Sequence, residues 1–172
     1  GLVYISGGVQ SRFMEAVLGT PLYKAVHTAF KNGAVIAGTS AGAAVMSKKM
    51  ITGKQLKHSS EDAGYTTIEA DNIEIKEGLG LIPDVIIDQH FIKRQRLNRL
   101  VTVSIENPDD ICIGIDESTA IIVEGLSARV TGSGQVLVIR NRLKNKKISS
   151  GLLGAQGLEL SVYLPGDSFS VK

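Results

Sequence analysis

The stretch Ala34-Val35-Ile36-Ala37-Gly38-Thr39-Ser40-Ala41-Gly42 decides how we interpret the chain. Four small or apolar residues, typical of a buried strand, run directly into the pattern Gly-x-Ser-x-Gly, and Ala43 to Lys49 is predicted to continue as a helix. A serine on a sharp strand-to-helix turn projects its hydroxyl above the sheet, and small neighbours leave room for strained backbone. The context therefore predicts that Ser40 is a nucleophile. An ordinary glycine-rich turn, or a phosphate-binding one, is the alternative.

The elements around this turn indicate an α/β fold. Leu2–Ile5 and Val85–Ile87 are short apolar runs typical of buried strands, while residues 12–31 and 94–106 have helical spacing. Apolar strands that alternate with helices predict a three-layer domain, with a largely parallel sheet flanked by helices.

The second half of the chain is predicted to be rich in strands. Ile111–Ile115, Ala120–Val123 and Leu158–Leu164 have strand character, and Val130–Arg140 suggests a hairpin around Gly132-Ser133-Gly134. With no long linker or internal repeat between the halves, we expect residues 1–172 to form a single catalytic domain.

The start of the chain raises a separate question. Gly1 precedes a strand that begins at Leu2, and a domain rarely begins in the middle of its sheet. We expect that an N-terminal segment with the first strands is missing before Gly1. Removal of an initial methionine from a chain that begins with a strand is the alternative.

Composition excludes several classes of protein. Hydrophobic residues make up 43% and charged residues 21%, which supports a packed core rather than disorder. The net charge of +2 is too small to indicate a nucleic-acid partner. No apolar run approaches the roughly 18 residues of a membrane span. Cys112 is the single cysteine of the sequence, so neither an intrachain disulfide nor a cysteine zinc site can form.

A serine hydroxyl needs a general base, and the sequence contains three histidines. His90 follows a predicted buried strand, at the carboxyl edge of the sheet where α/β sites form, so it is the predicted base. His27 lies within a predicted helix and His58 in a polar loop. A structural role at the strand end is the alternative for His90.

The base needs an acid that orients it, and two neighbouring carboxylates follow the predicted strand Ile111–Ile115. Glu117 and Asp116 point in opposite directions if that strand continues, and either could serve. A polar turn between two strands is the alternative. The resulting order of serine, histidine and acid differs from that of the α/β-hydrolases, but triads are recognised by geometry.

Two further groups surround these residues. The amides of Gly8, at the end of the first predicted strand, and of Ala41 are candidate donors to an oxyanion. A plain turn is the alternative for the paired glycines. Arg94, Arg96 and Arg99 suit carboxylate recognition, while a solvated basic helix face is the alternative. Since Arg96 and Arg99 share a helix face, not all three can point into one site.

Three blocks of the sequence together resemble cyanophycinase. They are residues 38–46, GTSAGAAVM; residues 88–91, DQHF, with the arginines that follow; and residues 114–120, GIDESTA. The blocks occur in the order of that family, which is grouped with aspartyl dipeptidase among serine peptidases of the class I glutamine amidotransferase-like fold. The resemblance implies that fold.

The resemblance implies a serine-type hydrolase that degrades cyanophycin, a poly-aspartate with arginine on each β-carboxyl. It implies release of β-Asp-Arg dipeptides through an acyl-enzyme, with Ser40 as nucleophile, His90 as base and Glu117 as acid. Five positions match the substrate pocket of the family: Gln10, Asp88, Gln89, Arg94 and Arg99. We predict that Arg96 also contacts the substrate.

One position departs from the family. Val9 stands where the family usually has Asp or Asn, which leaves open an aspartyl or isoaspartyl dipeptidase of the same clan. A non-catalytic binding subunit is a more distant alternative. The resemblance implies no metal or organic cofactor, a homodimer, and neither nucleic acid nor membrane as partner. A cytoplasmic location is predicted, with secretion left open.

Overall fold

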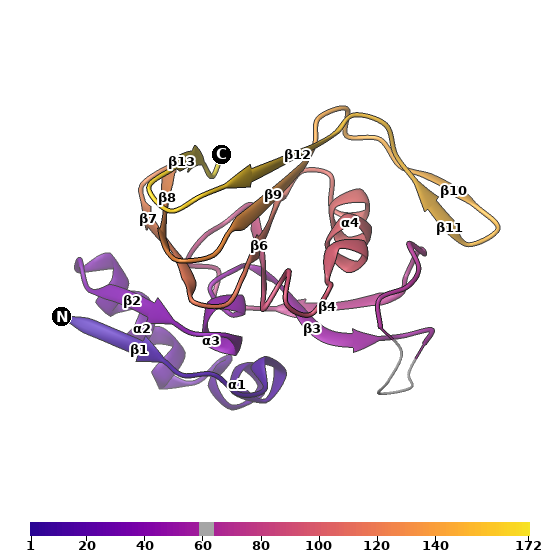
Figure 1. Cartoon of the computed structure of the whole chain (residues 1–172). Coiled ribbons are helices and arrows are strands. Elements are labelled where there is room, and N and C mark those ends of the chain that lie inside the picture. Colours follow the sequence, from indigo (N-terminus) through magenta and orange to yellow (C-terminus); the bar gives the residue numbers. More distant parts are fainter. Residues whose placement is uncertain (59–63) are drawn as a thin grey trace.

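A computed structural model describes residues 1–58 and 64–172 and shows a mixed α/β chain (Figure 1). The elements up to the last helix are β1 (Leu2–Ile5), α1 (Gln10–Val17), α2 (Pro21–Lys31), β2 (Val35–Gly38), α3 (Ala41–Ala44), β3 (Lys49–Gln55), β4 (Ile73–Glu77), β5 (Val85–Gln89) and α4 (Leu97–Glu106). The strands that follow are β6 (Ile111–Ile115), β7 (Thr119–Glu124), β8 (Ser127–Gly132), β9 (Val136–Asn141), β10 (Lys147–Ser149), β11 (Leu152–Gly154), β12 (Leu158–Tyr163) and β13 (Ser168–Ser170).

The strands form five small sheets rather than one largely parallel sheet. Their orders are β12-β9-β6-β5, β13-β8-β7, β1-β2, β3-β4 and β10-β11. Of the eight strand pairings within the described ranges, β1–β2 and β5–β6 are parallel and six are antiparallel. In the strand-rich second half, the short connections within the pairs β7–β8 and β10–β11 allow only antiparallel pairing.

The two N-terminal helices divide where proline predicts. The side chain of Thr20 caps α2 by accepting a hydrogen bond from the Tyr23 amide, and Pro21 takes the first helical position, where no amide is needed. Gly33 ends the helix with a φ of +83°. These contacts confirm the expected pair of helical pieces.

The helix predicted from Ala43 to Lys49 is wrong in extent. Helix α3 makes a single turn, Ala41–Ala44, and β3 begins at Lys49. The carbonyls of Val45 and Met46 accept from the amides of Leu79 and Leu81 at 2.7 and 2.9 Å. Because those carbonyls bond to a distant segment, the helix does not propagate.

The hairpin predicted within Val130–Arg140 is also wrong. Strand β8 pairs with β7 and β13, whereas β9 pairs with β6 and β12. The true hairpin lies one connection earlier, where β7 and β8 meet at the pair Glu124↔Ser127. Gly132 has a φ of +110°, and a Cβ there would lie 2.2 Å from the Ser118 carbonyl oxygen. The chain makes this close approach where it leaves the sheet of β8 and enters the sheet of β9.

The first two strands are less buried than their sequence predicts. Val3 and Ile5 face the core that the N-terminal helices cover. Leu2 and Tyr4 on the other face are 67% and 62% exposed, as is Val35 of β2 at 62%. Strand β1 pairs only with β2 among the described strands, and side chains alternate between the faces of this narrow sheet.

Strands β5 and β6 separate two clusters of core side chains. Val85 and Ile87 face the larger cluster with the N-terminal helices, whereas Ile86 and Cys112 pack with Leu100 of α4. Burial raises the pKa of the Cys112 thiol. This packing fixes the carboxyl end of β5 between the layers, where the functional residues follow. No helix in the described part of the chain is long and apolar enough to cross a membrane.

Candidate active site

The turn between β2 and α3 presents Ser40 in a strained conformation. Its φ is +53° and its ψ is −113°, a region that costs a non-glycine residue about 1–3 kcal/mol. A Cβ on Gly38 would lie 2.2 Å from the Gly42 carbonyl oxygen, and a Cβ on Gly42 would lie 2.1 Å from that of Ile5. Both glycines are therefore required by space, and the close packing they permit holds Ser40 in place.

Ser40, His90 and Glu117 are brought together in a chain of hydrogen bonds. The Oγ of Ser40 lies 2.9 Å from Nε2 of His90, and Nδ1 of His90 lies 2.9 Å from Oε1 of Glu117. With a carboxylate at Nδ1, the proton of a neutral imidazole belongs there, and Nε2 is left to accept the serine proton. The side chains of His90 and Glu117 are 26% and 43% exposed. The arrangement can activate a hydroxyl for attack.

The other candidate base and acid groups lie elsewhere. The Asp116 carboxylate accepts from the Lys93 amide at 3.0 Å, so the adjacent Glu117 is the one that reaches the imidazole. His58 pairs with Glu69 at 3.2 Å. The His27 ring packs at a tilt of 47° against the ring of Tyr23 in the same helix. Within the described residues, no group of three or more His, Cys, Asp or Glu side chains could hold a metal ion.

The paired glycines after β1 lie beside the serine. A Cβ on Gly7 would be 3.4 Å from Cβ and 3.9 Å from Oγ of Ser40. Gly8 has a φ of +142° and open space around it, a conformation that favours glycine. Ala41 is buried and begins α3 directly after the serine. The backbone near Ser40 is therefore open to a substrate on the glycine side.

Asp88 and Arg99 are buried against each other. The guanidinium makes a bidentate contact with the carboxylate, with Nε 2.7 Å from Oδ2, and each side chain is 1% exposed. Arg99 also donates to the Tyr65 hydroxyl and lies 4.5 Å from the centre of that ring. Burial opposes the charge of Arg99, but the Asp88 carboxylate outweighs it, so its pKa is raised. The two side chains satisfy one another rather than facing solvent.

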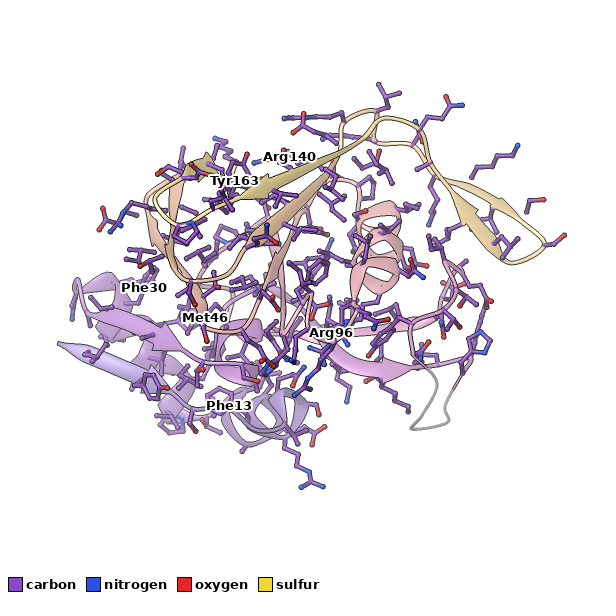
Figure 2. The ribbon with its side chains drawn as sticks, viewed as in Figure 1. Phe13, Phe30, Met46, Arg96, Arg140 and Tyr163 are labelled. Carbon is purple, nitrogen blue, oxygen red and sulfur yellow. The ribbon has the colours of Figure 1, made fainter. Side chains whose placement is uncertain are left out.

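Arg96 lies toward the middle of the molecule (Figure 2). Its Nη1 donates to the backbone carbonyl and to the side-chain oxygen of Gln89, and lies 3.6 Å from Asp88. Burial, followed by the nearby charge of Arg99, lowers the pKa of Arg96. Its buried Nε has no hydrogen-bond partner within the part of the chain that the structure describes. This donor is enclosed by the surrounding side chains, so a ligand would meet the other end of the guanidinium first.

Arg94 is exposed and lines a pocket of about 310 Å³. Its amide donates to the His90 carbonyl at 3.0 Å, so this wall of the pocket begins one turn after the imidazole. The lining carries two cations and no carboxylate: Gly64, Tyr65, Thr66, Lys93, Arg94 and Gln95. Such a surface suits a carboxylate or a chain of carbonyl groups.

Gln10 is buried, and its Nε2 donates to the Ile51 carbonyl at 3.0 Å, which links α1 to β3. Gln10→Ala should lower the free energy of unfolding by about 1–3 kcal/mol, because the Ile51 carbonyl would lose its side-chain donor in a buried place. Urea denaturation of the variant beside the original chain measures this loss. A change near zero would show that water replaces the donor.

Comparisons with known proteins identify the family of the chain. The model of Peptidase family S51 matches residues 1–131. The chain belongs to this family. Proteins named cyanophycinase are similar to this S51 chain. That of Synechococcus elongatus is 36% identical over 142 residues, covering 81% of this chain and 42% of its own length.

Two further cyanophycinases and one solved structure extend the similarity. The protein of Trichormus variabilis is 37% identical, with 80% of this chain and 44% of its own length covered. That of Geminocystis herdmanii is 33% identical, with 99% and 62% covered. The crystal structure of a peptidase from an acI-B1 Actinobacterium shares the fold, with a TM-score of 0.66 over 98% of this chain and 59% of its own, at 24% identity. The chain thus spans about two fifths of the length of the first relatives.

Sequence reasoning missed part of the site. The pocket lining beyond Arg94 had no motif to reveal it, since Tyr65 and Thr66 lie in a polar segment far from the arginines in sequence. Lys93 carried a signal that could have been used, because it adjoins Arg94 in the run after His90. The contact between Asp88 and Arg99 depends on how α4 packs against the sheet, and no pattern of neighbouring residues predicts that packing.

Proposed function

We propose that this chain is a single catalytic domain of a serine-type peptidase that hydrolyses cyanophycin through an acyl-enzyme. The observation that carries the proposal is the hydrogen-bonded chain from Ser40 through His90 to Glu117. Membership of the family and the relatives named cyanophycinase support the choice of substrate. The shared fold with a solved peptidase supports a glutamine amidotransferase-like layering of the sheet and helices.

The proposed mechanism follows from the order of these groups. His90 takes the proton of Ser40 as Oγ attacks an aspartyl carbonyl, and Glu117 stabilises the resulting imidazolium. The amides of Gly8 and Ala41 would hold the oxyanion of the tetrahedral intermediate. His90 then gives the proton to the leaving amine. Water, activated by the same imidazole, attacks the ester and restores Ser40.

The substrate fits the charges around the triad. Each unit of cyanophycin carries a free arginyl carboxylate and a guanidinium. The exposed Arg94 and the neighbouring Lys93 suit the carboxylates. The Arg96 guanidinium, whose side chain is 11% exposed, can donate to a backbone carbonyl. The Asp88 carboxylate could in principle bind the guanidinium of the substrate, but it is already paired with the Arg99 guanidinium. We therefore place the substrate contacts at Gln89, Arg94 and Arg96.

Incubation of the protein with cyanophycin tests the proposal directly. Mass spectrometry of the soluble products should show β-Asp-Arg. The intact mass of the protein should show whether Gly1 is its first residue. A parallel incubation with aspartyl and isoaspartyl dipeptides is the matched comparison. Cleavage of the dipeptides alone would replace the proposal with the dipeptidase that Val9 left open. A Ser40 that fails to react with a fluorophosphonate would favour a binding subunit.

The family resemblance also supports a homodimer and a cytoplasmic location. Sedimentation at several protein concentrations would test the first, because a dimer dissociates on dilution whereas a monomer keeps its mass. A constant monomer mass would remove the homodimer from the proposal without affecting the catalytic assignment.

A further inference from the structure

The turn that carries His90 and the turn that carries Glu117 are joined directly. The Phe91 amide donates to the Ile115 carbonyl at 3.2 Å. Two residues further along, the Lys93 amide donates to Oδ1 of Asp116 at 3.0 Å. Both bonds lie within three residues of the bond between imidazole and carboxylate on either segment. The base and the acid are therefore held at a separation that the backbone sets.

The acid turn is also anchored on its other side. The Thr119 hydroxyl donates to the Glu117 carbonyl at 3.0 Å and accepts from the Gly134 amide at 2.9 Å. The Asp116 amide donates to the Gln135 carbonyl at 3.2 Å. The turn is thus held to the connection between β8 and β9. Toward the base it is held by the Phe91–Ile115 backbone bond and by the Asp116 side chain.

Both turns contain strained backbone. His90 has a φ of +47° and Ser118 a φ of +53°. Non-glycine residues keep such conformations only where the surrounding contacts hold them. Glu117 cannot rely on packing for its position, because its side chain is 43% exposed. What places its carboxylate is the backbone on either side of it.

We propose that Asp116 is a positioning residue whose carboxylate fixes the distance between the His90 turn and the Glu117 turn. This inference rests on the proposed function, since it assigns the support of the same triad. Asp116 is half-buried, and no Lys, Arg or His of the described residues lies within salt-bridge distance of it. Its role is therefore that of an acceptor at a fixed place rather than that of a charge partner.

Three substitutions separate position from charge. Asp116→Asn keeps an acceptor oxygen at the same distance along the side chain and should keep kcat close to that of the original chain. Asp116→Glu keeps the charge but moves the acceptor by one methylene, and Asp116→Ala removes it. Both should lower kcat by about 10- to 100-fold while KM changes much less, because small displacements of catalytic groups have effects of that order.

A matched control exists in the same chain. Asp167 makes the same kind of bond, accepting from the Leu164 amide at 2.8 Å, at the turn before β13. Asp167→Ala should leave kcat and KM unchanged. Two readouts need no cyanophycin: the rate at which a fluorophosphonate labels Ser40, and the downfield proton NMR signal of the His90 Nδ1–H. Asp116→Glu should slow the labelling and weaken the signal, while Asp116→Asn and Asp167→Ala retain both.

The outcomes distinguish this inference from the proposed function. Equal labelling rates and equal NMR signals in the original chain and in Asp116→Glu would overturn the positioning role, whatever the substrate proves to be. Slow labelling of Ser40 in Asp116→Glu, together with a normal labelling rate in Asp116→Asn, would support it, even if cyanophycin is not cleaved. Thermal denaturation accompanies each variant, and if Asp116→Ala does not fold, the comparison between Asn and Glu decides.

Discussion

Ser40→Ala is expected to lower kcat by on the order of 10⁶-fold, the loss seen when a serine nucleophile is removed from a triad. The substitution removes the Oγ that lies 2.9 Å from the imidazole and leaves the backbone amides in place. If those amides hold the oxyanion as proposed, they retain weak catalysis. Steady-state hydrolysis of cyanophycin, the proposed substrate, measures the loss, and binding of the polymer by the variant should persist.

Ser40→Gly provides the matched variant, since it loses the same hydroxyl but relieves the backbone. Glycine adopts a φ of +53° without the penalty that alanine retains, although it also gains freedom in the unfolded chain. The net expectation is that the glycine variant is more stable than the alanine variant by about 1 kcal/mol. Both should lose the activity that depends on the serine hydroxyl. Urea denaturation of the two variants checks the difference, and a glycine variant that is less stable than the alanine variant would show that the turn is unstrained.

Features encoded by adjacent residues were predictable from the sequence. The Gly38-x-Ser40-x-Gly42 turn was visible because steric demand within a few residues fixes both glycines and the serine. The position of His90 was visible for a similar reason, since a buried apolar strand ends just before it. Both features depend on the spacing of residues that are adjacent in sequence, and that spacing is the same before and after folding.

Features that depend on distant pairing were not predictable. The strands on either side of Gly132 look like a hairpin in sequence, yet each finds its partners in a separate sheet. The arginine run illustrates the same limit. Helix α4 begins only at Leu97, after Gln95 at a φ of +50° and with Arg96 as its N-cap. The argument that Arg96 and Arg99 share a helix face therefore did not apply. Which arginine is buried depends on Asp88, which the fold supplies.

Asp88→Ala is expected to lower the free energy of unfolding by about 3–5 kcal/mol, because it leaves the Arg99 guanidinium buried without its carboxylate. Arg99 is 1% exposed and cannot reach water without moving α4. The Gln89 amide would also lose its acceptor, since it donates to Oδ1 of Asp88 at 2.8 Å. Chemical denaturation monitored by circular dichroism measures the effect.

A double substitution shows whether the pair or the carboxylate alone is responsible. Asp88→Leu combined with Arg99→Met removes both charges, and it should recover most of the stability lost by Asp88→Ala, because no buried charge remains unpaired. A substrate role for Asp88 gives the opposite pattern. In that case the single substitution would raise KM for cyanophycin at nearly unchanged stability, and the double variant would recover nothing. Since Asp88 and Arg99 are paired with each other and closed to solvent, we expect the pair to control stability. Through the end of the strand, we also expect it to control the placement of His90.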